Sequence, residues 1–446
     1  MQENRLAQQF SFSGLMKFSI PTMVMMVFMA LYQTVDGVFI SNLVGEIALT
    51  ALNIVYPYTS VVIAVAIMLS TGASAIIARD MGMGDEQRAK ENFSFIVLVG
   101  GLLAVILTVL GLLFIDNIIW FLGATPRIYK LCYDYLIVMI LSTPLSMLQM
   151  LFQTFFVTSG KPKLGLILTV LGGVANILLD ALFMGPLKMG VRGAALATAL
   201  GYGLTAVYGL GYFSFCRSGQ LYFVRPRLRM KVLKKTCLNG SSEMVNNLAV
   251  AVTTLLFNIV GLHFLKEEGV AAISIILYAQ FIMTAVFIGY SNGIAPVFSY
   301  KYGAGDLAQI KKVFKLSIFF VIGVSALVFL LSFVVSKPIA KVFAADNAYV
   351  LELAVHGFKL FAVSFLFSGV NIFASALFTA FSNGVISGAL SFLRTFALLI
   401  IALIALPALI GVDGIWLAVP VAEGIAAVFS LAALFIYRKK YHYGGR

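Results

Sequence analysis

The stretch IIARDMGMGDEQRAKENF at residues 76–93 returns as VFSYKYGAGDLAQIKKVF at residues 297–314, an offset of 221 residues. In this register a Gly-x-Gly-Asp turn, a lysine and a phenylalanine coincide. The same offset aligns VRGAALA at residues 191–197 with VDGIWLA at residues 412–418. Two distant blocks in a single register indicate that the chain consists of two similar halves.

The composition of these halves indicates a membrane protein. Of the 446 residues, 61% are hydrophobic and 11% are charged, with a mean hydropathy of +1.01, whereas a soluble domain is about half apolar and a quarter charged. A helix needs roughly 20 apolar residues to cross a bilayer. Because the apolar runs are continuous and do not alternate with polar residues, they predict helices and not barrel strands. Twelve such runs occur, at about residues 15–40, 50–78, 93–115, 132–157, 164–184, 191–215, 236–262, 270–299, 314–336, 350–381, 385–410 and 413–437.

The predicted fold is an all-α polytopic membrane protein with twelve transmembrane helices in two pseudo-symmetric six-helix bundles. The basic segment RSGQLYFVRPRLRMK joins the halves. We therefore predict an N-terminal lobe at residues 1–216, a cytoplasmic linker at 217–231 and a C-terminal lobe at 232–446. With an even number of spans in each half, the lobes share one orientation, and a central cavity between them follows.

The net charge of +13 is distributed like an orientation signal. If the N-terminus is cytoplasmic and the spans alternate, 22 of the 31 Lys and Arg residues lie inside, 7 outside and 2, Lys359 and Arg394, within spans. This bias follows the positive-inside rule, so both termini are expected in the cytoplasm, and nucleic acid is not an expected partner. We expect a monomer surrounded by membrane lipids. The first residues lack the order of a cleavable signal, and the three cysteines suggest neither disulfides nor a metal site.

Acidic residues within the first lobe predict a cation site. A charged side chain inside a bilayer costs at least about 2.5 kcal/mol, so Asp36 and Asp180 are expected to face a cavity or a partner. Asn176 shares a helical face with Asp180, and Thr198 shares one with Ala194. Their oxygens suit a hard cation, and neighbouring acids equally favour a shared proton. The second lobe has no acids at the matching positions, which favours a binding role over a structural hydrogen-bonded pair.

The second lobe carries its own intramembrane charges. Glu243 and Glu423 are candidates to bind a cationic substrate or a second proton, although Glu243 lies close enough to the inner end to extend toward water. Arg394 is a candidate counter-charge for one of them. Amide side chains and one tyrosine are candidates to line the cavity, because amides facing lipid are poorly satisfied; these are Tyr32, Gln33, Asn53, Gln149, Gln153, Asn246, Gln280 and Asn292.

The sequence does not predict an enzyme. The Gly-x-Gly-Asp turns lack the Gly-x-x-x-x-Gly-Lys spacing of a nucleotide cradle. The three histidines are scattered, and no nucleophile-base pair or metal cluster is visible at cavity depth. We expect no cofactor, no catalytic residue, and no metal beyond a possible Na+.

These features resemble the MATE (multidrug and toxic compound extrusion) transporters, particularly their prokaryotic DinF-like and MepA-like branches. The motifs that carry the resemblance are VDGVFISNLVG at residues 35–45, the paired Gly-x-Gly-Asp turns, NILLD at 176–180 and VRGAALAT at 191–198. The resemblance implies two bundles around a V-shaped cavity in a bacterial plasma (inner) membrane. It also implies drug export driven by a sodium or proton gradient.

The resemblance also assigns residues. In DinF-like members an acid of helix 1, an Asn and an Asp of helix 5, and a Thr with a nearby carbonyl of helix 6 bind the cation; the matching residues are Asp36, Asn176, Asp180, Thr198 and Ala194. Pro21 matches a proline at which helix 1 is proposed to bend. The NorM-like branch has an acid further along helix 7, where this chain has Val250 or its neighbours, so a NorM-type second site is not expected.

The predicted function is a secondary active multidrug exporter that moves amphipathic or cationic organic molecules against H+ and/or Na+ by alternating access. The alternative is a flippase for a lipid-linked sugar or other lipid precursor. A strongly basic central cavity would favour the flippase, and the chain has few intramembrane cations.

Overall fold

A computed structural model describes residues 5–344 and 347–444, and throughout these residues every regular element is a helix. In the first half these are α1 (Phe12–Leu43), α2 (Glu46–Gly82), α3 (Glu86–Leu113), α4 (Ile115–Phe121), α5 (Tyr129–Leu141), α6 (Thr143–Thr158), α7 (Pro162–Met184) and α8 (Gly190–Phe215). In the second half these are α9 (Met230–Gly303), α10 (Leu307–Ala344), α11 (Ala348–Phe361), α12 (Phe365–Ala380), α13 (Gly384–Phe392), α14 (Leu398–Ile410) and α15 (Val412–Tyr437).

The helices account for up to twelve membrane spans. Eleven described helical segments are long and apolar enough to cross a bilayer, and the bent pair α5 and α6 supplies one more. The long helix α9 contains two spans, divided at Lys266, whose backbone has φ 56° and ψ −149°. The prediction of an all-helical protein with two six-helix bundles is confirmed.

The predicted span at residues 132–157 is not one straight helix. It consists of α5 and α6, which meet at Ser142 with a bend of 53°. Pro144 lies in the first turn of α6, where its missing N–H is tolerated, and α5 ends just before it. The apolar pattern gave no sign of this break because both arms are equally apolar.

Each of the two Gly-x-Gly-Asp turns ends one helix and begins the next. Gly84 and Gly305 have φ of +80° and +68°, the left-handed conformation that commonly ends a helix. The aspartate that follows each then caps the next helix: Asp85 Oδ1 accepts from the Arg88 amide at 3.1 Å, and Asp306 Oδ1 accepts from the Gln309 amide at 3.2 Å. The repeated motif is therefore explained by the tight connection from one span to the next.

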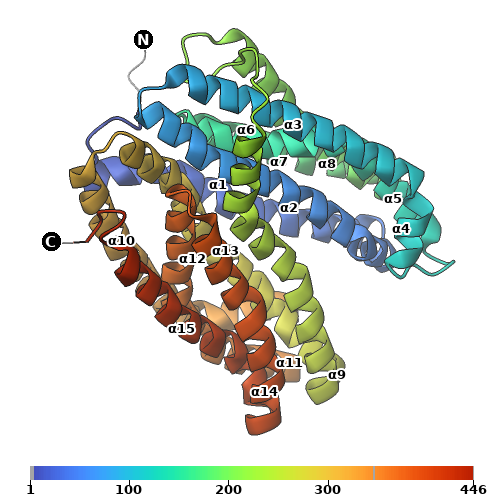
Figure 1. Ribbon diagram of the computed structural model, residues 1–446. Coiled ribbons are helices and arrows are strands. Elements are labelled where there is room, and N and C mark those ends of the chain that lie inside the picture. The colour runs from blue at the N-terminus through green and yellow to red at the C-terminus, as the bar shows by residue number, and fades with distance from the viewer. Residues whose placement is uncertain (1–4, 345–346, 445–446) are drawn as a thin grey trace.

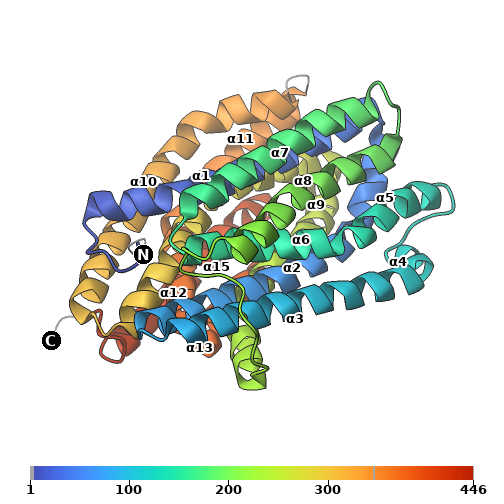
Figure 2. The ribbon, with the colours of Figure 1, turned by 90° about the horizontal axis from the view of Figure 1, so that it is seen from above.

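The two bundles meet at the end of the molecule that carries both chain termini, called here the terminal end, and diverge toward the opposite, distal end (Figure 1). Figure 2, the view from above, also places both chain ends on the left side of the molecule. The bundles touch through α2 and α9, where glycines allow the backbones to approach closely. A Cβ at Gly72 would lie 2.0 Å from the Thr236 carbonyl oxygen, and one at Gly240 would lie 1.9 Å from that of Met68.

The contact between bundles repeats the sequence offset. A Cβ at Gly82 would lie 2.1 Å from the Tyr300 carbonyl oxygen, and one at Gly303 would lie 2.2 Å from the Arg79 carbonyl oxygen. Residues 79 and 82 precede residues 300 and 303 by 221 positions. The pseudo-symmetry seen in the sequence is thus present in the packing.

The segment between the bundles leaves α8 after Phe215 and runs past α3 to the start of α9 at Met230 (Figure 2). It is held by Glu91 of α3, whose carboxylate lies 3.3 Å from Arg227 Nε and 2.8 Å from Arg229 Nη2. The last two residues of the predicted linker are already helical. The lobe boundaries themselves stay a prediction.

Candidate cation and substrate sites

Asp36 and Asp180 lie close together near the distal end of the first bundle. Asp36 is on α1, seven residues before that helix ends, and Asp180 is on α7, four residues before its end. Asp180 is fully buried, and Asp36 is half-buried. The two carboxyl groups face each other closely enough to form a hydrogen bond when one of them holds a proton.

The described protein groups leave this cluster short of positive charge. Oδ1 of Asp36, both carboxylate oxygens of Asp180 and Oδ1 of Asn176 are buried without a hydrogen-bond donor from the described residues. A buried acceptor left without a donor costs about 1–3 kcal/mol, more when it is charged. Two facing carboxylates also resist simultaneous ionisation. The arrangement therefore fits a bound cation or a shared proton, either of which would satisfy oxygens that the protein does not.

Two of the remaining predicted ligands, Asn176 and Thr198, contact each other across α7 and α8. Asn176 Nδ2 donates to Thr198 Oγ1 at 3.4 Å, so the amide oxygen of Asn176 is the group left free. Ala194 is buried on α8, which continues unbroken past it. In a regular helix its carbonyl already accepts the amide of residue 198, so only its second lone pair is available to an ion.

Pro21 lies within α1 and does not interrupt it. The helix runs as one element from Phe12 to Leu43, and Pro21 is buried. Because a proline has no N–H, it removes one backbone bond from the helix and supplies a weak point. A hinge at Pro21 stays a prediction.

A polar cavity of about 20 Å³ lies beside Asn176 in the first bundle. Of the predicted cavity residues it contains Tyr32 and Gln149, and Oε1 of Gln149 is buried without a partner among the described groups. Tyr202, Thr169 and Thr205 also line it and were missed in the sequence. Gly172, Gly173 and Gly201 also border it. They allow α7 and α8 to pack closely beside it, since a Cβ at Gly172 would lie 2.9 Å from the Gly201 carbonyl oxygen. A cluster of glycines in otherwise apolar spans was the available signal.

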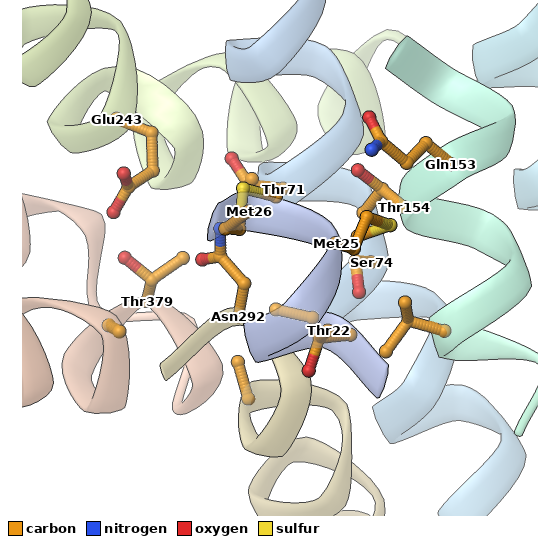
Figure 3. Close-up of a pocket in the computed structure, with 14 residues that line it drawn as sticks. Thr22, Met25, Met26, Thr71, Ser74, Gln153, Thr154, Glu243, Asn292 and Thr379 are labelled. Atoms are coloured by element: carbon orange, nitrogen blue, oxygen red, sulfur yellow. The ribbon is translucent and has the colours of Figure 1, made fainter. Parts of the chain in front are cut away.

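A second cavity, of about 50 Å³, lies between the bundles. Figure 3 shows Glu243, Asn292 and Thr379 on its second-bundle side, facing Gln153 and Thr154 of α6. Gln153 and Asn292 were cavity candidates from the sequence, and Glu243 was a candidate to bind a cationic substrate or a proton. The hydroxyl-bearing residues around them were not predicted and come from α1, α2, α6 and α12; they are Thr22, Thr71, Ser74, Thr154 and Thr379. Met25 and Met26 of α1 also line the cavity.

The structure pairs Arg394 with Glu423. Arg394 Nη1 donates to Glu423 Oε1 at 3.1 Å, and its Nη2 donates to Asn246 Oδ1 at 3.3 Å. Asn371 Nδ2 donates to the other oxygen of Glu423 at 2.6 Å. Arg394 lies on a π-helical segment, Leu393–Ala397, a local widening of a helix that is frequent at functional sites. The sequence left open which acid pairs with Arg394, and in the structure it is Glu423 of α15.

Three other predicted cavity residues are not assigned to either cavity. Asn53 is exposed on α2 and Gln280 is half-buried on α9, and neither lines the two cavities above. The side chain of Gln33 lies outside the described residues. Lys359, the other intramembrane cation, is exposed on α11.

Comparison with known proteins identifies the family. The MatE family model matches twice along the chain, at residues 21–182 and 244–409. The chain belongs to the MATE family of membrane transporters. One match falls in each predicted lobe, as expected for a duplicated transporter. The protein is therefore a multi-pass membrane transporter and not an enzyme.

MATE relatives cover almost the whole chain. Multidrug export protein MepA of Staphylococcus saprophyticus is 24% identical over 435 residues, covering 96% of this chain and 94% of MepA. MepA of Staphylococcus aureus is 24% identical over 436 residues, with the same coverage.

Solved MATE structures share the fold. A MATE protein in complex with MaL6 has a TM-score of 0.93 at 20% identity, covering 99% of both chains. An outward-facing multidrug resistance MATE transporter of the MOP superfamily also has a TM-score of 0.93 at 20% identity, again with 99% coverage of both chains. A MOP superfamily transporter from Pyrococcus furiosus, described by a binding pocket of reverse polarity, has a TM-score of 0.92 at 21% identity and the same coverage.

Proposed function

We propose that this MATE protein exports amphipathic or cationic organic molecules across a bacterial plasma membrane in exchange for H+ and/or Na+. The observation that carries the proposal is the group of buried, unpartnered oxygens around Asp36 and Asp180, which a small cation or a proton would satisfy. The MepA relatives are multidrug export proteins, which supports the substrate class. In this proposal both termini face the cytoplasm, and gradient energy replaces ATP.

Helix α1 links the ion cluster to the contact between the bundles. Asp36 lies at its distal part, and Thr22 lies 14 residues earlier, about 21 Å along the helix at 1.5 Å per residue. There α1 packs closely on α9: a Cβ at Gly293 would lie 2.2 Å from Thr22 Oγ1, and one at Gly289 would lie 2.5 Å from Met23 Cα. A change in α1 caused by ion binding therefore acts directly on the bundle interface. Pro21, next to Thr22, is the position at which we propose that α1 bends.

We infer that the two bundles have different roles in ion exchange. In the register of the repeat, Arg394 matches Gly173, which lines the small polar cavity beside Asn176. The second bundle thus carries its own guanidinium, paired with Glu423, where the first bundle has a glycine and no charge. Exchange of ions is accordingly assigned to the first bundle, and a fixed internal cation to the second.

The flippase alternative has less support. A cavity for an anionic lipid-linked sugar needs unpaired cations, and the guanidinium of Arg394 is bonded to Glu423 and Asn246. The described lining of the cavity between the bundles contains one charged residue, the acid Glu243. This charge favours a cationic cargo.

The test is transport in proteoliposomes with an imposed pH or sodium gradient and ethidium as cargo. Asp36→Asn and Asp180→Asn are expected to abolish gradient-driven ethidium movement, because neither amide can exchange a proton or fully balance a cation. Glu352→Gln, at an exposed acid of α11, is the matched control and should transport like the unmodified protein. Normal gradient-driven transport by either aspartate variant would refute the proposal, and the gradient that drives transport would identify the ion.

A further inference from the structure

Residues 5–11, which precede α1, form a segment without helical structure, called here the N-terminal strap. Leu6 and Phe10 of the strap are fully buried. The first residues of a domain are usually poorly ordered unless other parts of the protein hold them in place. The burial of both side chains therefore indicates a specific attachment.

The strap is attached to the second bundle at the turn between α9 and α10. Lys301, in the last turn of α9, donates from Nζ to the Ala7 carbonyl at 2.9 Å. Gln309, in the first turn of α10, accepts at Oε1 from the backbone amide of Phe10 at 3.0 Å. The side chain of Lys301 is 3% exposed, and Asp306 Oδ2 lies 3.3 Å from its Nζ. The strap thus supplies a buried cation of the second bundle with an oxygen partner.

The same strap is also held by the first bundle. A Cβ at Gly160 would lie 3.3 Å from Arg5 Cβ, so the beginning of the strap lies on the connection between α6 and α7. Its other end continues into α1, and the ring of Phe10 packs edge-on against Phe18 of α1, with centroids 5.9 Å apart. Figure 2 shows the start of α1 beside α10 at the terminal end. The strap therefore contacts both bundles where they meet.

The repeat shows that this attachment belongs to the second bundle alone. In the register of 221 residues, Lys301 matches Asp80 and Gln309 matches Arg88. In the first bundle the two matching side chains pair with each other, since Arg88 Nε lies 3.6 Å from Asp80 Oδ1. In the second bundle both side chains bind the backbone of the strap. The two turns are copies of one motif, and they differ at the positions that hold the strap.

We propose that the strap is a latch that keeps the two bundles together at the terminal end, and that it must leave the turn between α9 and α10 before they separate there. The strap is joined to α1 and lies on the first bundle at Gly160, while Lys301 and Gln309 hold it from the second bundle. Separation of the bundles at this end breaks one of these two sets of contacts. The latch therefore stabilises the arrangement that is closed at the terminal end. This inference rests on the proposed exporter function, because it names a contact that alternating access must break.

The first test removes the two side chains that hold the strap. In Lys301→Met/Gln309→Leu the apolar bulk is largely kept, while the strap backbone loses both partners. Spin labels on unnatural amino acids at Gln87 and Ala308, exposed positions that match in the repeat, report the separation of the two turns in lipid nanodiscs. The loss of one neutral and one charge-assisted hydrogen bond should raise the ratio of long to short distances at least about tenfold.

The matched control is Arg88→Leu. Arg88 occupies the position of Gln309 in the repeat, and its contact with Asp80 lies within the first bundle. This variant should leave the distance ratio unchanged. The latch is overturned if the double variant, eluting as a monodisperse folded protein, keeps the ratio of the unmodified protein, or if Arg88→Leu shifts the ratio equally. The measurement needs neither cargo nor gradient, so its failure is distinct from failure of the proposed exporter function.

The second test holds the strap in place. Gln9 Nε2 donates to Asp306 Oδ2 at 3.3 Å, so cysteines at these two positions are suited to a short bifunctional thiosulfonate reagent. The three native cysteines are replaced by alanine in this protein. Cross-linking should abolish the long distances and stop gradient-driven ethidium transport, and a reducing agent should restore both. Long distances that persist in the cross-linked protein would contradict the latch.

Discussion

Removal of the internal cation Arg394 is expected to destabilise the second bundle. In Arg394→Met the apolar stem is largely kept, while Glu423 loses the guanidinium 3.1 Å away. The carboxylate keeps the amide of Asn371 at 2.6 Å, but that neutral group does not balance its charge. The side chains of Arg394 and Glu423 are 13% and 9% exposed, so solvent screens the pair weakly.

The magnitude follows from this burial. Removing one partner of a buried ion pair costs about 3–5 kcal/mol, because the remaining charge is left uncompensated. Replacing both partners by uncharged groups, as in Arg394→Met/Glu423→Gln, is often close to neutral. The double variant should therefore be more stable than Arg394→Met, with a coupling energy of at least about 2 kcal/mol between the two positions.

The assay is a double-mutant cycle on the free energy of unfolding. Unfolding is followed by circular dichroism in mixed micelles of a mild detergent and sodium dodecyl sulfate. Lys359→Met is the matched control, since Lys359 is the other intramembrane cation and is exposed; its effect should be below about 0.5 kcal/mol. The reasoning is refuted if Arg394→Met costs less than about 1 kcal/mol, or if the double variant is as unstable as the two single losses added together.

Three further outcomes are expected. Gly72→Leu should drive the bundles apart at the terminal end, because a Cβ there would lie 2.0 Å from the Thr236 carbonyl oxygen; electron-spin distance measurements between labels on the two bundles would show it. Gly101→Leu, where a Cβ meets nothing within 4 Å, is the control and should leave these distances unchanged. Asp85→Ala removes a helix cap and should cost about 1 kcal/mol in the unfolding assay; no loss would contradict the capping role. The pKa of Cys216, which lies beyond the end of α8, is lowered chiefly by a hydrogen bond from Ser218, so its alkylation rate should rise with pH at a midpoint below that of a free cysteine. Ser218→Ala should shift that midpoint upward, and an unchanged pH profile would count against this account.

The sequence already contained most of the membrane architecture and part of the ion cluster. Continuous apolar runs predict helices because every backbone group in lipid must be bonded within its own segment. The acids Asp36 and Asp180 were recognisable as candidates because ionised groups in a bilayer are costly. Asn176 could be placed beside Asp180 because residues four apart share a helical face.

The sequence could not predict which side chains on different helices contact each other. Glu243 and Glu423 were equal candidates for Arg394, and the packing of α15 against the π-helical segment selected Glu423. The bend at Ser142 was missed because it follows from packing and Pro144, with no change in hydropathy.

What the sequence by itself determined is local and repetitive: which segments span the membrane, that the two halves match at an offset of 221 residues, and which positions carry charge. These follow from hydropathy and spacing along one chain. Only the tertiary structure decided that Asp36 faces Asp180, that Arg394 neutralises Glu423, and that matched residues of both halves enclose a cavity containing Glu243. The reason is physical: each of these contacts joins helices far apart in the chain, and their rotations and crossing points are set by close packing at small residues, which hydropathy does not encode.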